Sequence, residues 1–195
     1  MKQTYPILEY DPERHAIIDI DLENDALPNM PEHCVICFFR DVFERFLEQE
    51  LITPLTTIST EMGEHPVYLY SVGGHQVALL HQGMGAPLAA FLLEELIAMG
   101  GRKFIACGGA GVLDQTIAMG HLLVPTAAIR DEGTSYHYLP PSREIEPTVA
   151  ALAAIEATLK RRNAAYLYLR HGQPTAFFAK RRAKWPCASQ RDVWL

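Results

Sequence analysis

Residues 104–114 read F-I-A-C-G-G-A-G-V-L-D, a short apolar run that stops at three glycines within four positions and then turns apolar again. A run of this kind, bounded by turn residues, is typical of a buried strand. Glycine allows the backbone to approach a ligand closely and leaves main-chain N–H groups free to bind it. The stretch therefore predicts a strand that ends in a ligand-binding turn.

The segment before this stretch has the same organisation. A strand is predicted at 76–80, and the sequence H-Q-G-M-G-A-P leads from it into a helix that begins at Pro87 and ends at Gly100-Gly101. Such a unit is typical of an α/β fold, in which the helix returns the chain to a parallel neighbouring strand. Ligands bind beyond the carboxyl ends of these strands. We therefore expect the glycine turns Gly83-Met84-Gly85 and Gly108-Gly109-Ala110-Gly111 to form one binding edge.

The rest of the chain supplies further strands and helices. The sequence predicts strands at 33–39, 55–60, 67–71 and 121–129, a helix at 41–51 with Asp41 as its N-cap, and an Ala-rich helix at 149–161. Gly73-Gly74 joins two strands in a tight hairpin, because glycine accepts a positive φ without steric cost. Strands joined this tightly are antiparallel, so the sheet is expected to be mixed.

Composition limits the class of protein. The chain has 195 residues, of which 49% are hydrophobic and 21% charged, as in a single globular domain. Its apolar runs fall short of the ~20 residues needed to span a bilayer, and its N-terminus lacks the apolar segment of a signal peptide. We expect a cytoplasmic protein without a membrane partner. The C-x-x-C at Cys34 and Cys37 lies in a predicted strand, so its cysteines are expected to be buried on opposite faces.

Charge divides the chain unevenly. Residues 160–195 contain nine of the 17 basic residues and one of the 23 acidic residues, a net charge of +8, whereas the preceding 159 residues have −14. A change this sharp indicates a boundary. The basic runs at 160–162 and 180–184 do not belong to a nucleic-acid-binding motif, so we expect no nucleic-acid partner.

Other patterns of catalytic chemistry are weak. The glycine turn lacks the G-x-G-x-x-G spacing of dinucleotide sites, and the histidines lack metal-site spacing, so no metal is expected. The loop after residue 129 contains polar and aromatic residues of interest: Arg130, Asp131, Glu132, Tyr136 and His137. The two adjacent carboxylates diverge and cannot act as a glycosidase pair. His137 is open to two interpretations, an acid, base or ligand, or a plain exposed histidine, and the catalytic residue stays unknown.

Three separated motifs carry a resemblance to a known family. They are G-M-G-A-P with the following L-E-E-L, then F-I-A-C-G-G-A-G-V-L, then I-A-M-G-H-L-L-V-P-T-A-A-I-R-D-E-G-T-S-Y-H-Y. Over about 31–162 the chain resembles the nucleoside phosphorylases of the uridine phosphorylase branch. The resemblance implies a three-layer α/β/α sandwich with a mixed, partly barrel-like sheet, and a homo-oligomer. It implies that a nucleoside and inorganic phosphate, without another cofactor, react to a free base and ribose 1-phosphate.

The resemblance also implies site residues. Gly83, Met84 and Gly85 would lie beside the ribose and phosphate, and Gly108, Gly109 and Ala110 would line the phosphate and base. Arg130 follows the next strand, as an arginine does in relatives. Arg45, Tyr136 and His137 are accessory candidates.

Two segments depart from the family in its phosphate site. An arginine is usual at the position of Ala106, and a threonine at Gly109. In the usual G-D-P-x-R after the first strand, Asp41 is kept, the glycine is Arg40 and the arginine is displaced to Arg45. A phosphate site without bidentate guanidinium groups loses its strongest contacts. Impaired phosphorolysis is therefore expected, and the alternatives are a nucleosidase that uses water and a non-catalytic remnant.

The tail departs further. The family's W-T-T-D-x-x-Y/F-R-E-T and E-M-E motifs are missing. However, permissible codons for 171–187, read from the third base of the His171 codon, spell W-P-T-D-G-I-F-R-E-T-P-R-K-M-A-L, which is close to the first of these motifs. We therefore predict a partial phosphorylase-like domain at 1–162, with a fold incomplete at its C-terminus, and an atypical basic tail at 163–195 that is out of frame. Sequencing the gene tests this, because codons incompatible with the second reading would refute it.

Overall fold

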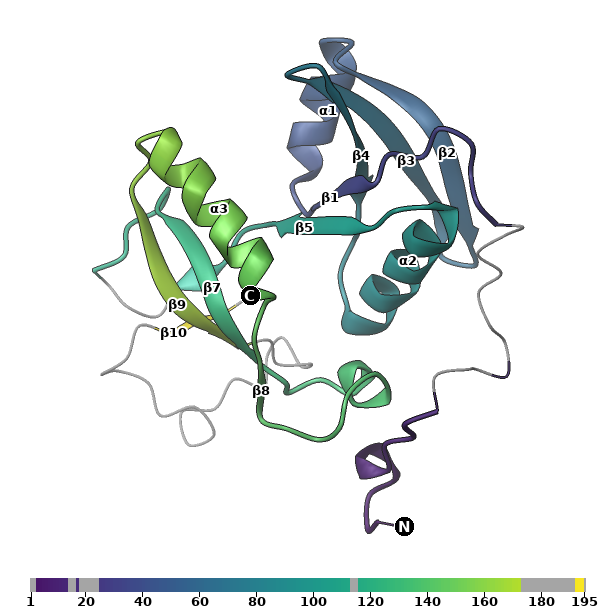
Figure 1. The fold of residues 1–195 in the computed structure, drawn as a ribbon, viewed down its shortest axis with the longest axis vertical. Helices are drawn as coiled ribbons and strands as arrows, with labels where there is room; N and C mark the ends of the chain where they lie inside the picture. The colour runs from purple at the N-terminus through teal and green to yellow at the C-terminus, as the bar shows by residue number, and fades with distance from the viewer. Residues whose placement is uncertain (1–2, 14–16, 18–24, 113–115, 173–191, 195) are drawn as a thin grey trace. The chain divides into compact units, whose positions relative to one another are not determined.

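The computed structural model describes residues 3–13, 17, 25–112, 116–172 and 192–194. They form an α/β protein whose chain divides into two compact units (Figure 1). The first unit is Pro12–Gly109, and the second combines Met1–Asp11 with Ala110–Leu195.

The first unit contains a five-stranded mixed sheet. Its elements are β1 (His33–Cys37), α1 (Arg40–Glu48), β2 (Ile52–Thr60), β3 (Gly63–Val72), β4 (His75–His81), α2 (Ala86–Met99) and β5 (Lys103–Cys107). The strand order is β2-β3-β4-β1-β5, with antiparallel pairing on the β2 side and parallel pairing of β1 with both β4 and β5. The predicted mixed sheet is confirmed.

The hairpin between β3 and β4 follows its glycines. Val72 pairs with His75, and Gly73 and Gly74 between them have φ values of 59° and 79°. Two consecutive positive φ values give a turn whose twist matches that of the flanking strands. The Gly-Gly pair therefore sets the register of the hairpin.

Helices cover both faces of this sheet. Leu92 and Leu96 of α2 pack with Cys34 on one face, and Phe43 of α1 packs with Cys37 on the other. The first unit is thus a three-layer α/β/α sandwich. The two cysteines of the C-x-x-C are buried on opposite faces, as predicted, and burial raises the pKa of Cys34 to about 11.

The start of α1 differs from the prediction. Phe39 occupies the N-cap position without a side-chain cap, so the prediction of Asp41 as N-cap is wrong. Asp41 lies in the first helical turn, where a carboxylate is favourable beside the helix N-terminus. Asp41 also forms an exposed ion pair with Arg45, which lies one helical turn further along α1.

The second unit contains another mixed sheet. Its elements are η1 (Pro6–Leu8), β6 (Gly111–Val112), β7 (Leu122–Ile129), η2 (Thr134–His137), β8 (Glu144–Ile145), α3 (Val149–Arg161), β9 (Tyr166–Gly172) and β10 (Asp192–Trp194). The strand order is β6-β10-β9-β7-β8, and α3 is the crossover between the parallel strands β7 and β9. β9 begins four residues beyond the boundary predicted at Arg162. Most of the predicted tail, 173–191 and 195, lies outside the described residues.

Across the described ranges, no helix combines the length and the apolar character that crossing a membrane requires.

Helix α3 begins at a capping residue. The N–H of Ala151 donates to Oγ1 of Thr148 at 3.3 Å. Thr148→Ala removes this acceptor and is expected to lower the free energy of unfolding by about 1 kcal/mol. Urea denaturation measures the change. Thr148→Ser keeps the hydroxyl and should retain most of the stability, so equal losses in both variants would contradict a capping role.

Candidate functional site

The carboxyl ends of three parallel strands form one edge of the first sheet. Cys37 at the end of β1 is in register with His81 of β4 on one side and with Cys107 of β5 on the other. The glycine turns that follow β4 and β5 therefore leave the sheet at the same edge. They do not follow neighbouring strands, because β1 lies between them, so that part of the prediction is wrong. Two strand spacings separate the turns by roughly 10 Å.

Two aromatic residues occupy the space between the turns. Phe38 and Phe39 follow β1 directly, and each is 40% exposed. A Cβ added to Gly108 would lie 3.1 Å from the Phe38 ring, and one added to Gly109 would lie 3.5 Å from the Phe39 ring. A side chain at 108 would therefore press on Phe38, which is 40% exposed and has room to shift, so packing favours glycine at 108 but does not require it. The sequence predicted a strand over 33–39 that included Phe38 and Phe39, so it did not predict that these two side chains lie beyond the strand end.

The first glycine turn needs its glycines for backbone reasons. Gly83 and Gly85 have φ values of 69° and 111°, which side-chain-bearing residues rarely adopt. Met84 between them is 78% exposed, and the carbonyl of Gly85 accepts from the N–H of Ala89 in the first turn of α2. The turn places an exposed thioether at the predicted binding edge.

Positive charge near this edge is already paired. Nε of Arg40 donates to Glu44 at 2.9 Å, and Nη2 of Arg45 donates to Asp41 at 3.5 Å. Both pairs are exposed i,i+4 contacts on α1, and such contacts contribute little energy. Arg45, the accessory candidate, is therefore free to exchange its partner for an anion at small cost.

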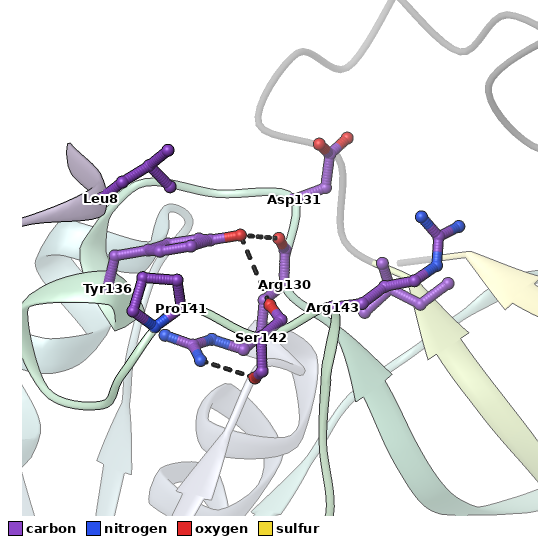
Figure 2. Close-up of a pocket in the computed structure, with 8 residues that line it drawn as sticks. Leu8, Arg130, Asp131, Tyr136, Pro141, Ser142 and Arg143 are labelled. Carbon is purple, nitrogen blue, oxygen red and sulfur yellow. Dashed lines mark hydrogen bonds between the residues drawn. The ribbon is translucent and has the colours of Figure 1, made fainter. Parts of the chain in front are cut away.

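The second unit contains a cavity of about 420 Å³. Its lining combines apolar side chains with charged and hydroxyl groups: Leu8, Ile129, Arg130, Asp131, Tyr136, Pro141, Ser142 and Arg143 (Figure 2). Figure 2 shows the Tyr136 ring between Leu8 and Pro141, with its hydroxyl directed at the carbonyl of Arg130. The predicted residues Arg130 and Tyr136 thus share one cavity, whereas His137 at the end of η2 is exposed and does not line it.

Arg130 is buried and fully hydrogen-bonded. Its side chain makes five bonds: Nε to Ser135 Oγ (3.0 Å), Nη1 to Pro140 O (2.7 Å) and Ser142 Oγ (2.8 Å), and Nη2 to Ser135 O (2.8 Å) and Leu139 O (3.1 Å). A guanidinium group has five N–H donors, so each of them has an acceptor within the protein. The Tyr136 ring also lies 4.5 Å from the guanidinium carbon. In this conformation Arg130 organises its own loop.

Glu132 completes this network. Its carboxylate accepts the backbone N–H of Ser135 at 2.9 Å and a short bond from the Ser135 hydroxyl. The same hydroxyl accepts from Arg130, so Ser135 links the two charged groups. Ser135 and Ser142 were not predicted, because serine in a loop carries no pattern that distinguishes a buried acceptor from a solvated one.

Among the residues that the structure describes, no three His, Cys, Asp or Glu side chains gather closely enough to hold a metal ion.

Comparison with known proteins places the chain in context. The sequence model of the phosphorylase superfamily matches residues 32–184. The uridine phosphorylase of Thermococcus kodakarensis is 33% identical over 113 residues, which is 54% of this chain and 41% of that protein. The chain thus matches less than half the length of that relative. The range 32–184 that the superfamily model matches includes both glycine turns, the loop of Arg130 and part of the predicted tail.

Solved structures share the fold. The uridine phosphorylase of Vibrio fischeri superposes with a TM-score of 0.67 at 24% identity, over 80% of this chain and 64% of that chain. The AMP nucleosidase of Bacteroides thetaiotaomicron gives a TM-score of 0.67 at 24% identity, over 85% of this chain and 68% of that chain. The phosphorylase-like α/β fold expected from the sequence is confirmed.

Proposed function

The chain belongs to the phosphorylase superfamily, and from this premise we propose that it is a nucleoside phosphorylase of the uridine phosphorylase type with impaired activity. The reaction is the reversible phosphorolysis of a nucleoside to a free base and ribose 1-phosphate. The observation that carries the proposal is the superfamily match over 32–184, which includes every residue predicted for the site. The proposal extends to a cytoplasmic homo-oligomer in pyrimidine salvage that needs no cofactor beyond phosphate as co-substrate.

The strand-end edge supports this chemistry through its backbone. Phosphorolysis passes through a ribosyl cation that phosphate attacks, so catalysis consists mainly of placing an anion against the sugar and stabilising charge. Main-chain N–H groups in the glycine turns after β4 and β5 are donors of the required kind. Gly108 has no side chain that would cover its own N–H.

The groups expected to bind phosphate support impairment. Ala106 stands where the resemblance places an arginine. In the second unit, the five N–H donors of the Arg130 side chain are all engaged within its own loop. Removal of a single donor that stabilises developing charge costs about 10²–10³-fold in rate. We therefore expect a slow enzyme.

A uridine cleavage assay tests the proposal. Uracil release with and without inorganic phosphate is measured by chromatography, and we expect slow release that depends on phosphate. Ala106→Arg restores a guanidinium group at the family position and should raise the phosphate-dependent rate by at least about tenfold. Ile105→Arg is the matched control, because Ile105 is 45% exposed and its side chain points to the opposite face of β5.

The remaining outcomes distinguish the alternatives. Release that is independent of phosphate would support a nucleosidase, with which the likeness to the AMP nucleosidase fold is compatible. No release from either the natural chain or Ala106→Arg would contradict both enzymes and favour a non-catalytic remnant.

A further inference from the structure

Two cysteines face each other across neighbouring strands at the candidate edge. Cys37 is the last residue of β1, Cys107 is the last residue of β5, and the two are direct partners in the parallel register. Side chains of directly paired residues point to the same face of a sheet. Adjacent strands lie about 4.8 Å apart, which is within the range of about 4.4–6.8 Å between Cα atoms joined by a disulfide.

The two thiols differ in access and interact with each other. Cys37 is 5% exposed and packs with Phe43 and Leu79, whereas Cys107 is exposed. Partial burial of the sulfur, together with the charge and hydrogen bonding of the Cys37 thiol, raises the pKa of Cys107 to about 12, so its thiolate fraction is small and its attack on a disulfide is slow. An accessible thiol next to a buried one is the arrangement in which a first oxidation is followed by an internal exchange.

The third described cysteine is excluded from this pair. Cys34 lies three residues before Cys37, belongs to the opposite face of the sheet and packs against α2. Its side chain therefore cannot reach Cys107 without unfolding of β1. Cys187 lies outside the described residues.

We propose that Cys37 and Cys107 form a site of oxidative modification, at which a small-molecule disulfide such as oxidised glutathione converts the two thiols into an intramolecular disulfide. The Cys107 thiolate attacks one sulfur of the oxidant and releases one glutathione thiol. The Cys37 thiolate then attacks Sγ of Cys107 and releases the second. Two electrons and two protons pass from the protein to the two glutathione molecules, so the step is balanced.

A disulfide between Cys37 and Cys107 would lie directly beside the candidate binding edge. Gly108 follows Cys107, Phe38 follows Cys37, and the backbone N–H of Phe38 donates to the carbonyl of Cys107 at 2.9 Å. A disulfide would thus fix the ends of β1 and β5 directly beside the glycine turn. Any effect on nucleoside or phosphate binding rests on the proposed function, whereas formation of the bond does not.

Peptide mapping tests the bond without an activity assay. The folded full-length chain is incubated with oxidised glutathione, alkylated and digested with trypsin, which yields peptides 15–40 and 104–130. We expect these peptides joined, with a mass about 2 Da below their sum, because two hydrogens are lost. Fragmentation between Cys34 and Cys37 identifies the linked residue. Oxidation should also raise the midpoint of thermal unfolding, and dithiothreitol should reverse the rise.

Two variants serve as controls. Cys107→Ser changes an exposed side chain and should abolish the joined peptides, whereas Cys187→Ser should leave them unchanged. Glutathione that remains on Cys107, a bond to Cys34 or Cys187, no modification, or a lowered unfolding midpoint would each overturn the proposal. A chain that forms the bond but cleaves no nucleoside would refute the proposed function and leave this site intact.

Discussion

Gly101→Ala is expected to lower the free energy of unfolding by about 2–3 kcal/mol, because the added methyl group has no room. Its Cβ would lie 2.8 Å from Sγ of Cys34, 2.8 Å from the carbonyl oxygen of Leu96 and 3.0 Å from the Phe104 ring. The Leu96 carbonyl is backbone and already accepts the N–H of Gly101 at 2.8 Å, so it cannot move without breaking the end of α2. Urea denaturation followed by circular dichroism measures the loss.

Gly109→Ala is the matched control. Its added Cβ would make only an ordinary contact, 3.5 Å from the Phe39 ring, and its φ lies outside the range that favours glycine. We expect a change within about 0.5 kcal/mol. Similar losses in the two variants would show that unfolded-state effects, rather than the lack of room for the methyl group, decide the cost at 101.

Single helices and turns of the fold were predictable because residues within or next to each element specify it. The helix at Val149–Arg161 has the predicted bounds, since Thr148 caps it and its interior is rich in alanine. The hairpin at Gly73-Gly74 also needs only two residues to specify its turn. The N-cap of α1 was misplaced by two residues, because Asp41 serves the first turn of a helix nearly as well as its cap.

Strand order was not predictable in the same way. A helix between β4 and β5 predicts that the strands are parallel, but not which strand lies beside which. That choice depends on β1, which ends at Cys37, far before β5 begins at Lys103, and which pairs through its backbone with both β4 and β5. The prediction that both glycine turns leave the sheet at one edge was therefore right. The prediction missed that Phe38 and Phe39, which follow β1, also lie at this edge.

The cavity of the second unit illustrates a further limit. Arg130 was selected by its position after a strand, which says where its side chain begins and nothing about its acceptors. Three of its five acceptors are backbone carbonyls, which every residue carries and no residue type reveals. A saturated guanidinium group and a ligand-binding one thus look identical in sequence, and only their substitution separates them.

Arg130→Lys is expected to lower the free energy of unfolding by on the order of 3 kcal/mol, although it keeps the positive charge. An ammonium group has three donors at one point, so at least two of the five acceptors around the buried side chain lose their partner. The loss should appear in urea denaturation and in faster proteolysis of the loop between β7 and β8.

Arg143→Lys separates this role from a general effect of charge in the same cavity. Arg143 lines the cavity but is exposed, so its replacement should change the free energy of unfolding by no more than about 0.5 kcal/mol. If Arg130 instead served a ligand, Arg130→Lys would keep the stability of the natural chain and weaken only phosphate-dependent cleavage. Stability and cleavage measured on the same two variants therefore decide whether the arginine after β7 holds its loop or a substrate.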